Sequence, residues 1–413
     1  MSDTYPIRPV TGEEFETWAR VVSDTYGEDR TEEDLAVERS ATELERTLAA
    51  FDEGRIIGGT AACTRVLTVP GAVLPTAGIT WVGVTPTHRR RGVLTCLMRR
   101  QLTDLYEGGG EPIAALRPSE APIYGRYGYG PASRGALLRC EKRSMAFLPG
   151  TDFGDGRIRL LERDEARPLV EEVYERVRPG AVGWPDRPGN CWDIRLADGP
   201  QDRQGATALR HAVHRESGGR ADGYALYRIK DGHGDGGRAV QVVELVAVTR
   251  RAYAALWRFL AGIDLVPWIE YEGAADEALP YLLADPRAVR AHEVDRLWVR
   301  LVDVARALAG RRYALPLEVV LDVRDDFCPW NTGRLRLWAE TGTAGCERTA
   351  AAPDLRLTPA ELGAAFLGGT TLETLARAGR VEELRPGALA RASAAFRGAG
   401  EPFCPGGPAF PAF

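Results

Sequence analysis

The chain is almost without lysine. Its 413 residues include 53 basic side chains, and only Lys142 and Lys230 among these are lysines. The net charge is -5, so the composition offers no general attraction for nucleic acid or for an anionic membrane, and we expect neither as a partner. The arginine bias indicates genomic composition rather than a basic binding surface.

Paired cysteines are also missing. The seven cysteines form no Cys-x-x-Cys pair, which favours free thiols over disulfides or zinc, and the histidines show no ligand spacing, so we predict no metal. No apolar run reaches the 18 residues of a membrane span. The first residues lack the basic and apolar segments of a signal peptide. Together these absences predict a cytoplasmic protein.

The most informative segment begins at residue 77. Residues 77–84 (AGITWVGV) are almost wholly apolar and predict a buried strand, and apolar residues at helical spacing follow from Val93. Between them stands Arg89-x-x-Gly92, where glycine permits close approach and new helix N–H groups attract a diphosphate. An open strand edge can bind an amide-bearing arm. These are the needs of coenzyme A, although an ordinary strand–turn–helix with solvated arginines would give the same pattern.

A second informative segment, SEAPIYGRYGYGP (119–131), follows a predicted strand at 113–116. A reaction that releases a thiolate from a coenzyme A thioester needs a donor that protonates this leaving group. Tyrosine, with an ordinary pKa of about 10, can be that donor if it lies beside the sulfur. Three tyrosines among glycines are also typical of a packed aromatic turn, which accounts for at least two of them.

These two segments carry a resemblance. The turn is similar to the acyl-CoA-binding motif (Arg/Gln)-x-x-Gly-x-(Gly/Ala) of the GCN5-related N-acetyltransferases, with Leu94 in place of the last small residue. Residues 67–92 and 119–133 together resemble the enhanced intracellular survival (Eis) family of acetyltransferases. The resemblance implies hexamers that use acetyl-CoA to acetylate primary amines of aminoglycosides, often at several positions, or of lysine-bearing proteins.

The chain also repeats its own pattern. VELVAVTRRAYAALWRFLAGI (243–263) is similar to WVGVTPTHRRRGVLTCLMRRQL (81–102), but Ala252 and Tyr253 replace the glycine and valine and would crowd a diphosphate. We predict a degenerate second copy that binds no cofactor. The alternative is that any buried strand–helix unit gives such a pattern.

The predicted fold class is therefore α/β (α+β), with two tandem acetyltransferase-like domains, the second degenerate, and a third domain that resembles a sterol carrier protein. The limits are 1–150, 151–290 and 291–413, with residues 149–156 (PGTDFGDG) as a linker. In the first domain we expect a helix over 31–50 and a strand over 54–67, broken at Gly58-Gly59. The third should hold helices near 359–367, 371–378 and 387–396.

The Eis resemblance implies the site residues. Tyr124 is the general acid, and the C-terminal carboxylate of Phe413 is the base, carried by a tail rich in phenylalanine and proline (EPFCPGGPAFPAF). Asp24 and Trp81 shape the substrate pocket. The residues that hold acetyl-CoA are Val82, Gly83, Val84, Arg89, Arg90, Arg91, Gly92, Val93, Leu94, Thr95, Ser119 and Glu120. A pocket carboxylate such as Asp24, or water, is the alternative base, and a non-catalytic acyl-CoA or lipid-binding protein is the alternative function.

Overall fold

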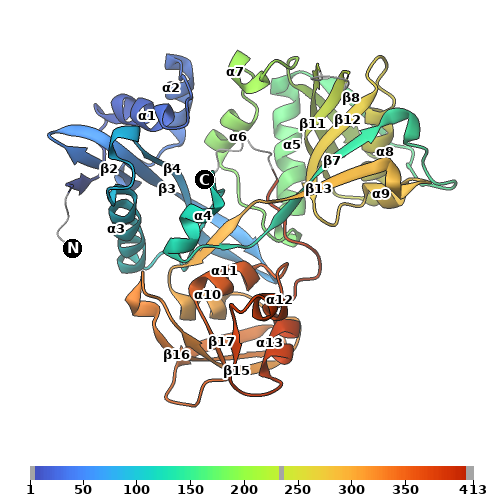
Figure 1. The fold of residues 1–413 in the computed structure, drawn as a ribbon. Coiled ribbons are helices and arrows are strands. Elements are labelled where there is room, and N and C mark those ends of the chain that lie inside the picture. Colours follow the sequence, from blue (N-terminus) through green and yellow to red (C-terminus); the bar gives the residue numbers. More distant parts are fainter. Residues whose placement is uncertain (1–4, 232–236, 406–413) are drawn as a thin grey trace.

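The computed structural model describes residues 5–231 and 237–405, and it arranges them in three lobes, each built on one sheet (Figure 1). The blue and teal part of the chain supplies most of the first lobe, green and yellow the second, and orange and red the third. No helix within these two ranges is both long and apolar enough to cross a membrane.

The first sheet has the strand order β1-β2-β3-β4-β5-β14-β6, with the long hairpin of β3 and β4 at its centre. Helix α3 buries Met98 and Leu102 in one cluster, and helix α1 buries Phe15 and Trp18 in another. The elements are β1 (Ile7–Arg8), α1 (Phe15–Asp24), α2 (Glu32–Ala41), β2 (Thr47–Asp52), β3 (Arg55–Val69), β4 (Ala72–Val84), α3 (Val93–Gly108), β5 (Ile113–Leu116), α4 (Ala121–Tyr124), β6 (Gly130–Pro131) and β14 (Trp298–Leu301).

The second sheet has the order β13-β7-β12-β11-β10-β9-β8. Its helices α5 and α8 also bury their apolar faces in separate clusters, one around Tyr174 and one around Trp257. The elements are β7 (Arg134–Glu141), β8 (Arg157–Leu161), α5 (Arg163–Val177), α6 (Gly189–Arg195), α7 (Pro200–Arg203), β9 (Arg210–Arg215), β10 (Ala221–Lys230), β11 (Ala239–Ala247), α8 (Arg250–Ala261), β12 (Trp268–Ala274), α9 (Leu279–Leu282) and β13 (Val289–Asp295).

These two sheets exchange strands. β7 precedes the predicted linker, yet it pairs antiparallel with β12 and β13 of the second sheet. β14 follows the second sheet in the chain, yet it pairs with β5 and β6 of the first. The predicted limits at residues 150 and 290 therefore do not coincide with the limits of the sheets.

The third sheet has the order β17-β16-β15-β18-β19. Its helix α11 packs closely on the first sheet: a Cβ on Gly363 would lie 2.2 Å from the Val299 carbonyl oxygen, and one on Gly130 would lie 1.9 Å from that of Ala360. Only glycine permits this backbone-to-backbone contact. The elements are α10 (Val304–Gly310), β15 (Leu317–Val323), β16 (Gly333–Glu340), β17 (Thr343–Arg348), β18 (Leu355–Leu357), α11 (Pro359–Phe366), α12 (Leu372–Arg377), β19 (Glu382–Glu383) and α13 (Ala388–Phe396).

Two predictions of local structure are wrong. The helix expected over 31–50 ends at Ala41, because residues 47–52 form the buried strand β2 and turn back through Glu53 and Gly54, both at positive φ. The break expected at Gly58-Gly59 is absent, since β3 runs through it. These glycines instead admit their neighbours: a Cβ on Gly59 would lie 2.1 Å from the indole nitrogen of Trp18.

Candidate active site

The site begins where two parallel strands part. β4 and β5 pair only over Thr76–Gly78 and residues 113–115. Just beyond, the register of β4 on β3 shifts, so that Trp81 and Val82 together face Thr60, and Trp81 takes φ 55°. A side chain held in the left-handed region costs of order 1–3 kcal/mol and is typical of functional sites. The bulge leaves β4 free of β5 at the end nearest α3.

A pocket of about 290 Å³ lies at this parting. Among the predicted site residues it is lined by Trp81, Val82, Ser119 and Tyr124. The other eight lining residues were not predicted, and four of these carry charged or aromatic side chains: Tyr26, Arg117, Asp295 and Arg296.

Tyr124 ends the short helix α4 and is 3% exposed. Burial raises the pKa of its hydroxyl well above the ordinary value, and the nearby Tyr26 acts in the same direction. The hydroxyl therefore stays protonated at neutral pH and can donate. Its ring meets the ring of Tyr129 edge-on at 6.1 Å, and the Tyr129 N–H donates to the Tyr124 carbonyl at 3.3 Å.

Gly92 is the N-cap residue of helix α3, and no side chain caps the helix there. Gly92 has φ 88°, which disfavours any other residue, and nothing lies within 4 Å of where its Cβ would be. No side chain caps the helix N–H groups, and Gly92, Arg90 and Arg91 beside them are exposed. This arrangement fits a diphosphate. Leu94, the departure from the motif, packs against the apolar cluster of α3.

Arg89 takes a different place from its two neighbours. Its guanidinium donates to the Val84 carbonyl at 3.3 Å and to the Thr25 carbonyl at 3.1 Å. It joins the end of β4 to the end of α1.

Of the two residues predicted to bind the substrate, the structure places one in the pocket and one outside it. The Trp81 ring packs against Trp18 at 5.2 Å and lines the pocket. Asp24 is exposed and does not line it. Tyr26 does, and its hydroxyl donates to the Val82 carbonyl. Burial of that hydroxyl raises its pKa to about 12.

The opposite wall comes from far along the chain. Glu272 of β12 pairs with Arg117 at 3.5 Å and also with Arg296. Asp295 accepts from the indole N–H of Trp298 at 2.7 Å. No local pattern marks these residues, because only the strand exchange brings them beside Tyr124.

The predicted base, Phe413, lies outside the described residues. The segment that leads toward it is well placed: the Phe403 N–H donates to the Val182 carbonyl at 3.1 Å, and Cys404 is fully buried. Burial raises the pKa of the Cys404 thiol to about 11, and Arg117 and Glu272 are among the charges that act on it. Phe403 and Pro405, on either side of Cys404, line a second pocket together with Tyr253 and Tyr271. Within residues 5–231 and 237–405, no cluster of three or more histidine, cysteine or acidic side chains could hold a metal.

Comparison with known proteins agrees with this architecture. Residues 6–132 and 183–301 each match a family model described as an acetyltransferase (GNAT) domain, and residues 304–405 match a sterol carrier protein domain. The predicted fold class is thus confirmed.

Whole-chain relatives agree as well. The chain is 40% identical over 98% of its length to an uncharacterized N-acetyltransferase of Streptomyces avermitilis, covering 100% of that protein. It is 38% identical over 80% of both chains to N-acetyltransferase Eis of Mycobacterium tuberculosis. The crystal structure of Eis1 from Mycobacterium abscessus superposes with a TM-score of 0.83 at 36% identity, over 97% of this chain and 99% of that one. The chain therefore belongs to the Eis family of N-acetyltransferases, GCN5-related enzymes that use acetyl-CoA.

Proposed function

We propose that this enzyme transfers the acetyl group of acetyl-CoA to a primary amine of a cationic substrate, such as an aminoglycoside, possibly at several positions, or a lysine side chain. The observation that carries the proposal is the buried Tyr124 hydroxyl in a pocket between parted strands, beside the uncapped start of α3. A thioester donor, a proton donor and an amine can meet at that point.

The cofactor arm uses backbone groups. The first N–H groups of α3, at Val93, Leu94 and Thr95, have no side-chain cap, and they bind the diphosphate together with the exposed Arg90 and Arg91. The edge of β4 at Val82–Val84, which β5 does not cover, binds the amides of the pantetheine arm, where Tyr26 and Arg89 already donate to the Val82 and Val84 carbonyls. Ser119 lines the pocket beside it, and the exposed Glu120 follows in the chain. Acetyl-CoA supplies the activated acetyl group.

The proton transfers involve two groups. Tyr124 keeps its proton until the thiolate leaves and then donates it, because burial raises its pKa. The ammonium of the substrate must first lose a proton, and the carboxylate of Phe413 is the proposed base. A C-terminal extension that moves this carboxylate should abolish turnover but not acetyl-CoA binding, and a tagged enzyme with full activity would contradict the assignment.

Acidic side chains support a cationic substrate. Asp24, Glu28 and Asp29 are exposed around Tyr26, which lines the pocket, and Asp295 lies in its wall. The two arginines of that wall are paired with Glu272, so their charge is partly balanced. Trp81 offers a flat apolar face beside these charges.

The alternative function, holding an acyl-CoA or a lipid without turnover, is less well supported. In the core of the third domain Arg311 is fully buried and donates to the carbonyls of Phe366 at 2.5 Å and Phe396 at 2.8 Å. A guanidinium satisfied by helix-end carbonyls is a poor lining for a lipid tail.

The deciding experiment is thiol release from acetyl-CoA with aminoglycosides, polyamines and lysine peptides, with Tyr124→Phe as the control enzyme. Turnover that depends on the amine and on Tyr124 supports the proposal. Tight acyl-CoA binding without turnover on any amine supports the alternative. A chelator arm tests the proposal that no metal takes part, since the rate should not change.

We further propose a cytoplasmic homo-hexamer, on the strength of the Eis resemblance. Light scattering of the purified full chain should give a mass about six times that of one chain.

A further inference from the structure

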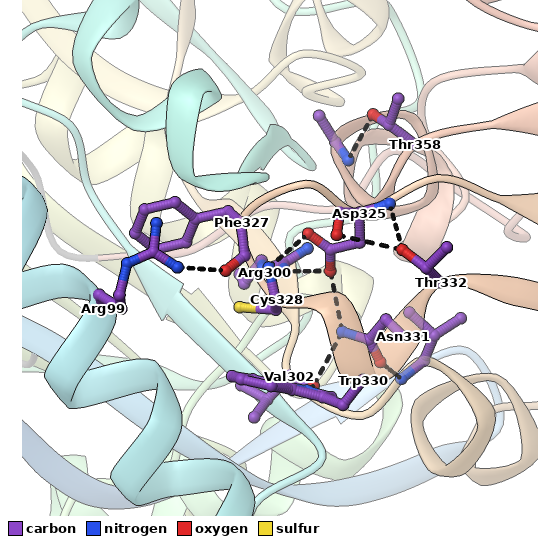
Figure 2. A network of polar contacts seen from close by, with 12 residues as sticks. Arg99, Arg300, Val302, Asp325, Phe327, Cys328, Trp330, Asn331, Thr332 and Thr358 are labelled. Atoms are coloured by element: carbon purple, nitrogen blue, oxygen red, sulfur yellow. Dashed lines mark hydrogen bonds and ion pairs between the residues drawn. The ribbon is translucent and has the colours of Figure 1, made fainter. Parts of the chain in front are cut away.

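A loop of the third domain leaves its own sheet and lies against the first domain (Figure 2). This loop, residues 324–332, joins β15 to β16. It contacts α3 at two points on one helix face. The guanidinium of Arg99 donates to the Phe327 carbonyl at 3.0 Å and lies 4.4 Å from the Phe327 ring, and Tyr106 stacks on Trp330 at 4.6 Å.

The same loop reaches the tyrosine-rich turn. The Phe327 ring packs on Tyr127 at 5.0 Å, and Tyr127 is buried. The Tyr127 hydroxyl is 3.3 Å from the hydroxyl of Thr95, in the first turn of α3. Phe327 thus supports the point where the predicted diphosphate site meets the segment that carries Tyr124.

Arg300 makes a second connection to the turn. It is fully buried on β14, and a Cβ on Gly128 would lie 2.5 Å from its terminal nitrogen, so Gly128 rests directly on the guanidinium. Gly128 in turn donates its N–H to the Gly125 carbonyl at 3.1 Å, which closes the turn after Tyr124. The position of this turn above β14 therefore depends on the position of the Arg300 guanidinium.

Asp325 fixes Arg300 and the loop together. Its carboxylate accepts from Arg300 at 2.5 Å, from the Cys328 N–H at 2.9 Å and from the Asn331 amide at 3.0 Å (Figure 2). Two other guanidinium nitrogens of Arg300 are buried without a hydrogen-bond partner among the described residues. Asp325 is therefore the carboxylate that pairs with Arg300, and the Cys328 thiol of the same loop lies beside the guanidinium as well.

We propose that the 324–332 loop is a positioning element of the acetyl-transfer site. Asp325 acts through Arg300 and Gly128, and Phe327 acts through Tyr127, to hold the turn that presents Tyr124 to the leaving thiolate. The proposal rests on Tyr124 as the general acid. It gives the third domain a role in catalysis through a loop rather than through a bound lipid.

The test compares Asp325→Asn with Asp326→Asn in the full chain. Asp326 is the exposed neighbour, so the same substitution there is a matched control. Asp325→Asn keeps the side-chain size but unpairs Arg300. We expect kcat to fall roughly 10–100-fold, as displacement of a catalytic group by about 1 Å does, while the acetyl-CoA dissociation constant changes less than about threefold. Phe327→Leu should give a smaller loss of the same kind and serves if Asp325→Asn folds poorly.

A double variant separates positioning from plain stability. If Asp325 acts through Tyr124, Asp325→Asn/Tyr124→Phe should be as slow as Tyr124→Phe alone, within about twofold. The proposal would be overturned if the double variant lost kcat by the product of the two single losses. It would also be overturned if Asp325→Asn had the same kcat as Asp326→Asn and only a lower melting temperature. If Tyr124→Phe keeps full turnover, Tyr124 is not the general acid and the loop has no acid to position. If Tyr124→Phe is slow but Asp325→Asn is as fast as the unaltered enzyme, Tyr124 remains the acid and only the role of the loop is contradicted.

Discussion

The two acetyltransferase-like domains share one scaffold but fill it differently. In each, two central strands run parallel for a few residues and then part: β4 from β5 after Gly78, and β11 from β12 after Val242. In each, the strand that precedes the helix has an irregular register near the parting. The scaffold alone therefore does not decide which domain binds a cofactor.

The start of the following helix differs. The N-cap residue of α3 is Gly92, which has no side chain to cap the helix, whereas the N-cap residue of α8 is Thr249, whose hydroxyl accepts from the Ala252 N–H at 3.1 Å. Arg251 is paired with Asp152 at 2.6 Å, and the Tyr253 hydroxyl donates to Glu277. The second domain satisfies within itself the groups that the first domain leaves for a diphosphate.

The other side of the parting differs as well. Where the first domain has Trp81, the second has Glu244, which is enclosed by Arg187 at 2.7 Å, Arg195 at 3.3 Å and the Tyr224 hydroxyl. The second domain also has a pocket, of about 330 Å³, but Tyr253, Tyr271 and Glu277 and several residues of the segment 399–405 line it. The comparison supports the prediction that the second domain binds no acetyl-CoA, since its polar groups bind one another.

The largest expected effect tests the two short helices after the parting. Tyr124 ends α4 and is 3% exposed, whereas Tyr281 lies in the corresponding α9 and is 78% exposed. Tyr124→Phe should lower turnover by roughly 10²–10⁴-fold, the range for a lost general acid. Tyr281→Phe should have no effect on the same assay. Equal rates for the two variants would remove the assigned acid.

The second largest expected effect is on the free energy of unfolding, and it follows from removal of the charge of Glu244. Glu244→Gln leaves two buried arginines without their carboxylate, and loss of one partner of a buried pair costs about 3–5 kcal/mol. Glu270→Gln in the same sheet breaks an exposed pair with Arg139 and should cost about 0–1 kcal/mol. Denaturant unfolding measures both. Similar values would mean that the cluster does not stabilise the second domain.

The helix start gives the next effect. Gly92→Asp adds strain at φ 88° and a negative charge at the diphosphate site, and should weaken acetyl-CoA binding on the order of 100-fold. Calorimetry on the unaltered chain should give one acetyl-CoA per chain. Ala252→Gly should leave that number at one, because Thr249 and Tyr253 still occupy the second site. A stoichiometry of two in either protein would contradict the comparison.

The sequence predicted the scaffold better than the pocket. Local apolar spacing, which can be read from the sequence, was enough to predict the repeat, the strand at 113–116 and the helices of the third domain. β2 was missed because Glu43-Leu44-Glu45-Arg46 and the two alanines that follow give a helical pattern. Residues 47–52 form a strand instead, because they are buried between β1 and β3. The strand exchange and the wall at Asp295 and Arg296 are contacts between distant segments, which local spacing does not encode.

The smallest predicted effect compares a buried carboxylate, Glu244, with a partly buried one, Glu38. Burial alone would raise the pKa of Glu244, but Arg187 and Arg195 outweigh it and lower the value to about 2. Glu38 on α2 has one arginine, Arg30, at 3.0 Å, and there burial prevails and raises the pKa to about 7. The two domains therefore treat a buried acid in opposite ways.

The sign for Glu38 follows from proton binding. An unfolded glutamate titrates near about 4.3, so between that value and about 7 the folded state binds more protons, and stability falls as pH rises through this range. Glu38→Gln mimics the protonated acid, and Arg30 keeps its pair with Glu28. At pH 8 the variant should melt about 2–4 °C above the unaltered protein, the shift that ~1 kcal/mol produces in a domain of this size. Below pH 4 the variant and the unaltered protein should have the same melting temperature, because Glu38 is then protonated in the folded and in the unfolded state. A variant that melts lower at pH 8 would show that Arg30 outweighs burial, as the arginines do at Glu244.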